Sequence, residues 1–262
     1  TNGLIWMIDL SIGLGAGKML AVLALDAHHH QLVSGAPTLH HVHCLGVAVA
    51  DSWTGETIAA WLKRLIAQLG RPAAYLKDGG SDLHKAVALL EDDGLGSPCF
   101  DDISHAAASM LKRTYQHHPA FERFVSACGK VSGKLKQTLL ACLVPPTVRT
   151  KARFMNVHRL VTWADRILRL SPAGRAKRGS LVAKLRDALG DLPECRTLIK
   201  RFLSDAGALL ACQEIRKTHG LGEHTLAQCE PRIAAMPTAA IRQEFRAYLH
   251  YQLKTAKTLG LD

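Results

Sequence analysis

The hydrophobic pattern of this chain changes character near residue 103. Before that point, apolar runs of strand length are mixed with helical patterns, and after it the strand signals stop. The first part contains three strand-like runs, Leu4–Ile12, Met19–Ala27 and Val42–Ala50, which suggest a meander. The sequence therefore predicts an α/β region over residues 1–103 and an all-α region over residues 104–262, punctuated by proline and glycine.

A helix, a strand, a second helix and a short strand follow the meander. Thr54 is a suitable N-cap for the first helix, whose apolar residues recur at helical spacing until Gly70-Arg71-Pro72 ends it. Residues 73–77 then form a strand pattern, residues 82–90 a helix pattern and residues 98–100 a last short strand. The predicted order is β-β-β-α-β-α-β. The glycine-rich stretch 13–18 lacks the spacing of a phosphate-binding loop and precedes a strand, so we expect a hairpin turn there.

Composition excludes several classes of protein. No apolar run approaches the roughly 20 residues of a membrane span, and residues 1–3 lead into a strand without the pattern of a signal peptide. The seven cysteines include no C-x-x-C pair, so neither a disulfide framework nor a zinc site is indicated. We expect a reducing compartment, a cytoplasmic location and no membrane partner.

Charge divides the chain at the same place as the hydrophobic pattern. Residues 1–103 hold 6 Lys+Arg against 11 Asp+Glu, and residues 104–262 hold 27 against 11, so a net charge of −5 is followed by one of +16. Such a basic region favours a polyanion, because neutralised phosphates release condensed counterions. The alternative is a set of solvated helix faces. The candidate DNA-binding residues are Lys130, Lys134, Lys136, Arg149, Lys151, Arg153, Arg159 and Trp163, the last of which is otherwise a core residue.

Two aspartates stand at the strands of the first region. Asp9 lies in the middle of the apolar run Leu4–Ile12, and Asp78 directly follows the strand pattern at residues 73–77. A buried carboxylate costs several kcal/mol unless it is paired, hydrogen-bonded or bound to a cation. The two strands therefore suggest one acidic site. The alternative for Asp9 is a local pairing or a half-exposed strand, and for Asp78 a turn before Gly79-Gly80.

With two aspartates placed in this element order, the chain resembles the ribonuclease H-like core of DDE transposases. In many bacterial insertion-sequence transposases an all-helical insertion follows the fifth strand of that core, as residues 104–262 do here. The resemblance implies an α/β fold with a mixed five-stranded sheet, flanking helices and a large all-α insertion. It implies DNA strand cleavage and strand transfer with Mg²⁺ or Mn²⁺, which Asp9 and Asp78 would bind as catalytic residues, with Asp9 bridging two ions.

The same resemblance implies DNA partners, a nucleoid-associated location and further site residues. The partners would be transposon ends and target DNA, held by a homodimer in a synaptic complex. Asp102 and His105 are possible accessory residues, because Asp-x-x-His at the start of a helix resembles a motif found after the fifth strand in several insertion-sequence families. The alternative for Asp102 is a helix N-cap. A catalytically inactive DNA-binding module and a structure-selective nuclease on the same core are the other candidate functions.

The third carboxylate that the resemblance implies has no convincing position in the sequence. It would follow the helical insertion, but the late glutamates lack the spacing of tyrosine, arginine and lysine that often surrounds the family's glutamate; they are Glu214, Glu223, Glu230 and Glu244. We expect the catalytic glutamate just beyond residue 262. With only two carboxylates, residues 1–262 would bind metal weakly and be inactive.

Overall fold

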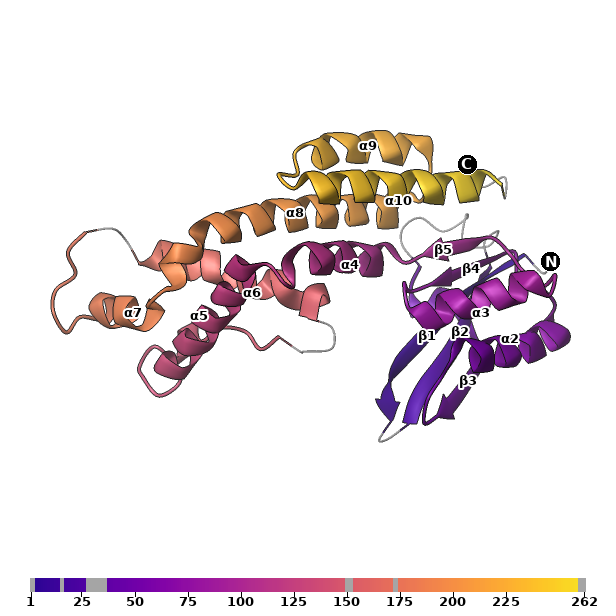
Figure 1. Ribbon diagram of the computed structural model, residues 1–262, viewed down its shortest axis with the longest axis horizontal. Coiled ribbons are helices and arrows are strands. Elements are labelled where there is room, and N and C mark those ends of the chain that lie inside the picture. Colours follow the sequence, from indigo (N-terminus) through magenta and orange to yellow (C-terminus); the bar gives the residue numbers. More distant parts are fainter. Residues whose placement is uncertain (1–2, 15–16, 27–36, 149–152, 172–173, 259–262) are drawn as a thin grey trace. The chain divides into compact units, whose positions relative to one another are not determined.

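The computed structural model describes residues 3–14, 17–26, 37–148, 153–171 and 174–258 (Figure 1). The chain forms two compact units. The sheet unit comprises Thr1–Ala106, Gln213–Cys229 and Ala247–Asp262, and the helical unit comprises Ala107–Cys212 and Glu230–Arg246. This division by compactness differs from a single boundary at residue 104, because two late helical segments group with the sheet.

Five strands form one mixed sheet in the order β3-β2-β1-β4-β5. The strands are β1 (Leu4–Leu14), β2 (Gly17–Asp26), β3 (Val42–Ala50), β4 (Ala74–Lys77) and β5 (Cys99–Asp101). β1, β2 and β3 pair antiparallel, whereas β4 pairs parallel with β1 and β5 parallel with β4. The strand order and directions are those of a ribonuclease H-like core, which confirms the predicted fold class. Leu14 pairs with Gly17, so the glycine-rich stretch joins a hairpin.

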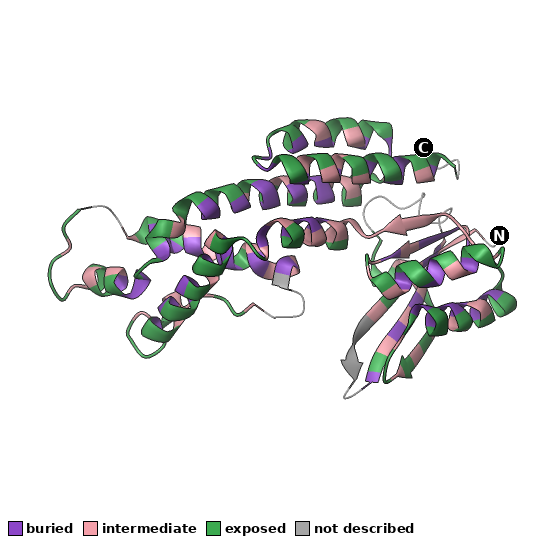
Figure 2. Ribbon diagram, viewed as in Figure 1, coloured by how far each residue is buried: buried purple, intermediate pink, exposed green. Residues whose placement is uncertain are grey.

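Two helices, α2 (Gly55–Leu69) and α3 (Ser81–Asp92), connect β3 to β4 and β4 to β5. They turn buried residues toward the sheet and exposed residues outward (Figure 2). The predicted ends of α2 are confirmed: the Thr54 side chain accepts a hydrogen bond from the amide of Thr57, and Gly70 follows with φ +82°. Beneath the helices, Trp6 and Tyr75 meet edge to face at 6.3 Å between ring centroids.

The remaining elements are helical. They are η1 (Leu39–His41), α4 (Ile103–Tyr115), α5 (Pro119–Leu135), η2 (Ala141–Leu143), α6 (Arg153–Leu170), α7 (Leu181–Leu189), η3 (Leu192–Cys195), α8 (Arg196–His219), α9 (Glu223–Ala234) and α10 (Ala239–Lys257). No helix among the described residues is long and apolar enough to cross a membrane.

An aromatic cluster forms the core of the helical unit. Phe121 lies 5.4 Å from Phe154 and 6.2 Å from Phe202, and Tyr115 lies 4.9 Å from Phe202, measured between ring centroids. The fully buried carboxylate of Asp205 accepts hydrogen bonds from the Tyr115 hydroxyl at 2.6 Å and from the amide and hydroxyl of Thr238. Thr238 immediately precedes α10, so this polar network ties the start of α10 to α4 and α8.

Candidate active site

Three aspartates lie at neighbouring strands of the sheet. In the register of the parallel strands, Ile8 pairs with Lys77 and Lys77 pairs with Asp101. Asp9, Asp78 and Asp102 each directly follow one of these paired residues. Since the three strands run in the same direction, the aspartates reach the same region of the sheet. The strand that carries Asp9 and the strand that precedes Asp78 are therefore adjacent.

Three charged or titratable residues of this region act on the carboxyl group of Asp9. The pKa of its carboxyl group is raised above the ordinary aspartate value, first by partial burial and then by the negative charge of Asp78. Asp102 raises the pKa further, and His105 opposes the rise. Asp78, Asp102 and His105 thus all act electrostatically on Asp9. The prediction that Asp9 is buried within its strand is wrong, because its side chain is exposed on the sheet.

The loop after β4 fixes the carboxylate of Asp78. Its Oδ1 accepts a hydrogen bond from the amide of Gly80 at 2.8 Å, and Gly80 is the N-cap of α3. A Cβ atom at Gly80 would lie 2.9 Å from this same oxygen, whereas a Cβ atom at Gly79 would meet nothing within 4 Å. The turn predicted as the alternative for Asp78 is therefore present. This turn fixes the direction of the carboxylate, and metal binding by Asp78 stays a prediction.

Asp102 caps the helix that follows β5. Its Oδ1 accepts hydrogen bonds from the amides of Ser104 at 2.5 Å and of His105 at 3.0 Å, at the start of α4. The capping alternative that the sequence suggested is thus present. Capping engages Oδ1, and the charge of the same carboxylate still acts on Asp9.

A buried ion pair, which the sequence did not reveal, supports the ends of β4 and β5. The side chain of Lys77 is only 2% exposed, and its ammonium group lies 2.5 Å from Asp101 Oδ1 and 3.0 Å from His84 Nδ1. The amide of Asp102 donates to the carbonyl of Lys77 at 2.8 Å. These contacts join the two strands directly before Asp78 and Asp102. A lysine within an apolar strand is the signal that could have indicated such a pair.

Helix α10 holds the backbone of the same strand end. The Tyr248 hydroxyl donates to the carbonyl of Asp101 at 2.7 Å, and Gln252 Oε1 accepts from the amide of Asp101 at 3.3 Å. Gln252 is 1% exposed, and burial raises the pKa of Tyr248, so its hydroxyl stays protonated and able to donate. Tyr248 and Gln252 are four residues apart, so both side chains lie on one helix face. This spacing was the sequence signal that could have indicated their shared contact.

Each of the four late glutamates has a contact of its own. Glu223 pairs with Lys257, Glu230 with Arg246 and Glu244 with Arg113, while Glu214 accepts from the Thr218 hydroxyl at 3.5 Å. In the part of the chain that the structure describes, Asp78 and Asp102 are the two carboxylates whose charges raise the pKa of Asp9.

The donor atoms of this region suit a hard divalent cation. Carboxylate oxygens are the ligands that Mg²⁺ and Mn²⁺ prefer, and Mg²⁺ needs few of them because it keeps several waters. A cation would also offset the mutual repulsion that raises the pKa of Asp9. Over the described ranges, however, no three His, Cys, Asp or Glu side chains are grouped as a metal-binding set. The residues fit an ion that takes most of its ligands from water.

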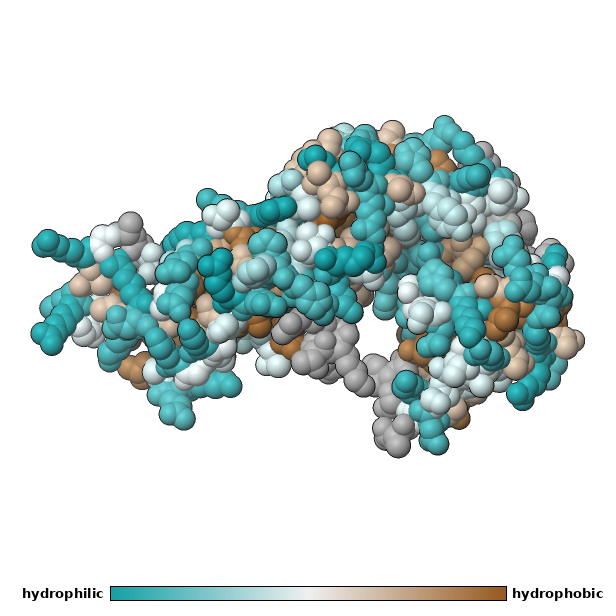
Figure 3. Space-filling view, viewed as in Figure 1, coloured by the Kyte–Doolittle hydropathy of each residue, from teal (hydrophilic) through white to brown (hydrophobic). Residues whose placement is uncertain are grey.

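The helical unit carries most of the positive charge. It contains 23 Lys+Arg against 8 Asp+Glu, a net of +15, whereas the sheet unit has a net charge of −4. Hydrophilic side chains cover most of its visible surface (Figure 3). Among the predicted DNA-binding residues, Lys136 and Arg159 are exposed, and Arg153 begins α6. Arg149 and Lys151 lie outside the described residues.

Three of the predicted DNA-binding residues make internal contacts. Lys130 pairs with Asp191 at 3.1 Å, and Lys134 donates to the carbonyl of Asp187 at 2.9 Å. The indole N–H of the half-buried Trp163 donates to the carbonyl of Leu143 at 3.0 Å. These contacts give each residue a structural role. DNA binding by the same residues stays a prediction.

Comparison with solved structures gives distant structural similarity. No family model and no curated protein matches the chain. A solved structure of the Drosophila P element transposase strand transfer complex matches 98% of this chain with 13% sequence identity and a TM-score of 0.41. The chain spans 64% of the length of that neighbour. The fold assignment therefore rests on the strand order and helix connections of the sheet itself.

Proposed function

We propose that this chain is the catalytic part of a DDE-type DNA transposase of the bacterial insertion-sequence kind. The observation that carries the proposal is the set of three aspartates, Asp9, Asp78 and Asp102, at adjacent strands of a ribonuclease H-like sheet. The reaction would be metal-dependent cleavage of DNA phosphodiesters followed by strand transfer. A structure-selective nuclease would use the same residues.

Each residue of the acidic site has a defined part in this proposal. Asp9 and Asp78 would hold Mg²⁺ or Mn²⁺, an ion that activates an attacking oxygen and stabilises the leaving one in such reactions. Gly80 aims the Asp78 carboxylate through its amide, and Lys77 and Asp101 keep the strand ends in place. Asp102 and His105 would be accessory residues, of which Asp102 raises the pKa of Asp9 and His105 lowers it.

DNA would be held by the helical unit. Its net charge of +15 suits a phosphate backbone, and such binding weakens steeply as salt rises. The partners in this proposal are the ends of the element and a target duplex, brought together by a homodimer.

If Asp102 supplies the third carboxylate, residues 1–262 should be active, contrary to the inactivity expected with only two carboxylates. Nicking of supercoiled plasmid in Mn²⁺ tests this enzymatic proposal. Asp9→Asn and Asp78→Asn should abolish nicking while far-ultraviolet circular dichroism and the unfolding midpoint show a folded protein. Asp92→Asn, at the exposed end of α3, removes the same charge outside the acidic site and should keep activity. Equal loss in all three variants, or unchanged nicking in Asp9→Asn, would contradict the assignment.

A DNA-binding module without catalytic activity is the second candidate. It is favoured by the charge of the helical unit and by the lack, over the described residues, of a three-residue metal-binding set. Salt-dependent DNA binding without nicking, in a protein whose Asp9 and Asp78 variants bind Mn²⁺ as well as the parent does, would favour this candidate.

A further inference from the structure

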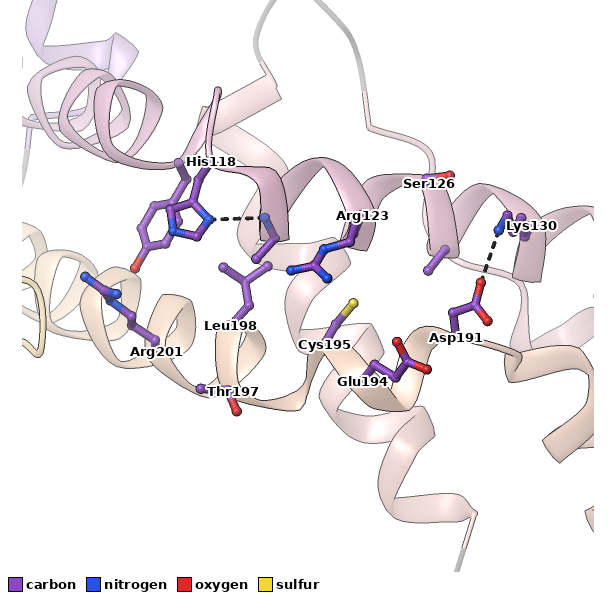
Figure 4. A pocket seen from close by; sticks show the side chains of 13 residues that line it. His118, Arg123, Ser126, Lys130, Asp191, Glu194, Cys195, Thr197, Leu198 and Arg201 are labelled. Atoms are coloured by element: carbon purple, nitrogen blue, oxygen red, sulfur yellow. Dashed lines mark hydrogen bonds and ion pairs between the residues drawn. The ribbon is translucent and has the colours of Figure 1, made fainter.

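A cleft of about 380 Å³ lies within the helical unit, away from the acidic strands in sequence. One wall is the first half of α5, and the other is formed by η3 and the start of α8 (Figure 4). The apolar floor includes Ala127 and Leu198, and polar and charged side chains line the rim. The cleft is large enough for part of a polymer to enter.

Two arginines lie along the cleft, Arg201 at one end beside His118 and Arg123 near the middle beside Cys195 (Figure 4). Figure 4 shows Arg123 extending from α5 into the cleft and Arg201 on α8 near His118. Within the described part of the chain, the guanidinium of Arg123 makes no hydrogen bond or ion pair. Arg201 uses Nε to donate to the Thr238 hydroxyl at 3.0 Å, and no contact of its two terminal nitrogens is seen among the described residues. Two guanidinium groups therefore have donors to offer a ligand.

The opposite end of the cleft is closer to neutral. Asp191 is paired with Lys130, and Glu194 projects beside them (Figure 4). Between the ends lies Cys195, whose thiol pKa is raised by burial, although Arg123 opposes the rise. The positive charge that no carboxylate pairs with therefore lies along the part of the cleft from Arg201 to Arg123.

We propose that this cleft binds the phosphate backbone of DNA, with Arg123 and Arg201 as donors. The proposal rests on the proposed function, which already requires DNA at the helical unit. Guanidinium groups bind phosphate through paired N–H donors, which an isolated ammonium cannot match. The net charge of +15 on the unit draws the polyanion to this surface. Neither arginine was singled out by its sequence context.

The first test is the salt dependence of duplex DNA binding by the whole chain. Loss of one phosphate contact lowers the slope of log K against log[salt] by about 0.9. Arg123→Gln should show this reduction, and Arg123→Lys should recover part of it. Lys200→Gln removes one charge from the exposed surface of α8 outside the cleft and serves as the matched control. Equal slopes for Arg123→Gln and Lys200→Gln would overturn the proposal.

The second test uses the cleft's own thiol as a reporter. Alkylation of Cys195 by iodoacetamide, followed by peptide mass analysis, should slow several-fold at saturating DNA. The exposed Cys44 on β3 should react at an unchanged rate. Unprotected Cys195 would overturn the cleft assignment even where DNA binding itself persists. Absence of any DNA binding would instead contradict the proposed function as well. Loss of nicking with DNA binding retained would contradict the enzymatic proposal and not the proposal for the cleft.

Discussion

Gly80 controls the direction of the Asp78 carboxylate, and replacing it with alanine tests this coupling. The new Cβ atom would stand 2.9 Å from Asp78 Oδ1, whereas ordinary contact begins at 3.4 Å. The oxygen must therefore move by about 0.5 Å, which also weakens the 2.8 Å hydrogen bond from the Gly80 amide. Gly80 has φ −68° and ψ 136°, so alanine is tolerated by the backbone.

The expected result is a loss of metal affinity that exceeds the loss of stability. Disturbing a group that orients a metal ligand typically costs about 10- to 100-fold in affinity. The fold should lose only about 1 kcal/mol, because alanine is a poorer N-cap than glycine. Calorimetric titration with Mn²⁺ and urea unfolding measure the two quantities separately.

Gly79→Ala is the matched control, since its Cβ atom meets nothing within 4 Å. It should change Mn²⁺ affinity by less than about twofold, because it leaves the metal-ligand orientation undisturbed. If Gly80→Ala and Gly79→Ala bind Mn²⁺ alike, the argument that Gly80 positions a metal ligand is refuted.

Three further predictions concern stability. Lys77→Met leaves Asp101 without its cation and should cost about 3 kcal/mol in urea unfolding, the lower end for a broken buried pair because Asp101 is 26% exposed. Adding Asp101→Leu should recover most of that loss, and equal stability of single and double variants would contradict the pairing. Asp9→Asn should raise stability at neutral pH, because the raised pKa of Asp9 makes its ionised form costly in the folded protein, and the gain should vanish as the pH falls below about 3.9. A pH-independent difference would refute this. Tyr115→Phe removes a 2.6 Å hydrogen bond to the buried Asp205 and should cost about 1–3 kcal/mol by thermal unfolding, whereas a change under 0.5 kcal/mol would show that the network compensates.

Local chemistry explains why much of the fold could be predicted. Thr54 and Gly70 mark the ends of α2 by capping rules that involve only neighbouring residues. The β1–β2 hairpin likewise follows from two apolar runs on either side of a glycine-rich turn. These signals do not depend on distant parts of the chain, so the sequence alone carries them.

Contacts between distant residues explain what was missed. The burial of Lys77 depends on the register that places it beside Asp101, and Tyr248 reaches Asp101 from 147 residues away. The apolar strand pattern around Asp9 also predicted a buried residue, whereas Asp9 is exposed. An apolar run indicates a buried strand as a whole, whereas the exposure of one side chain depends on what covers its face of the sheet. The cleft at Arg123 lies between α5 and α8, and no local sequence pattern predicts that these two helices are neighbours.

Mn²⁺ binding followed by electron paramagnetic resonance tests the central claim, that Asp9 and Asp78 form one metal site. The free Mn²⁺ signal should fall on addition of the parent protein, and it should persist with Asp9→Asn or with Asp78→Asn while Asp92→Asn behaves like the parent. Loss of binding in both site variants is the result that the acidic site predicts. Equal Mn²⁺ binding by the parent and by the Asp9→Asn and Asp78→Asn variants would contradict it.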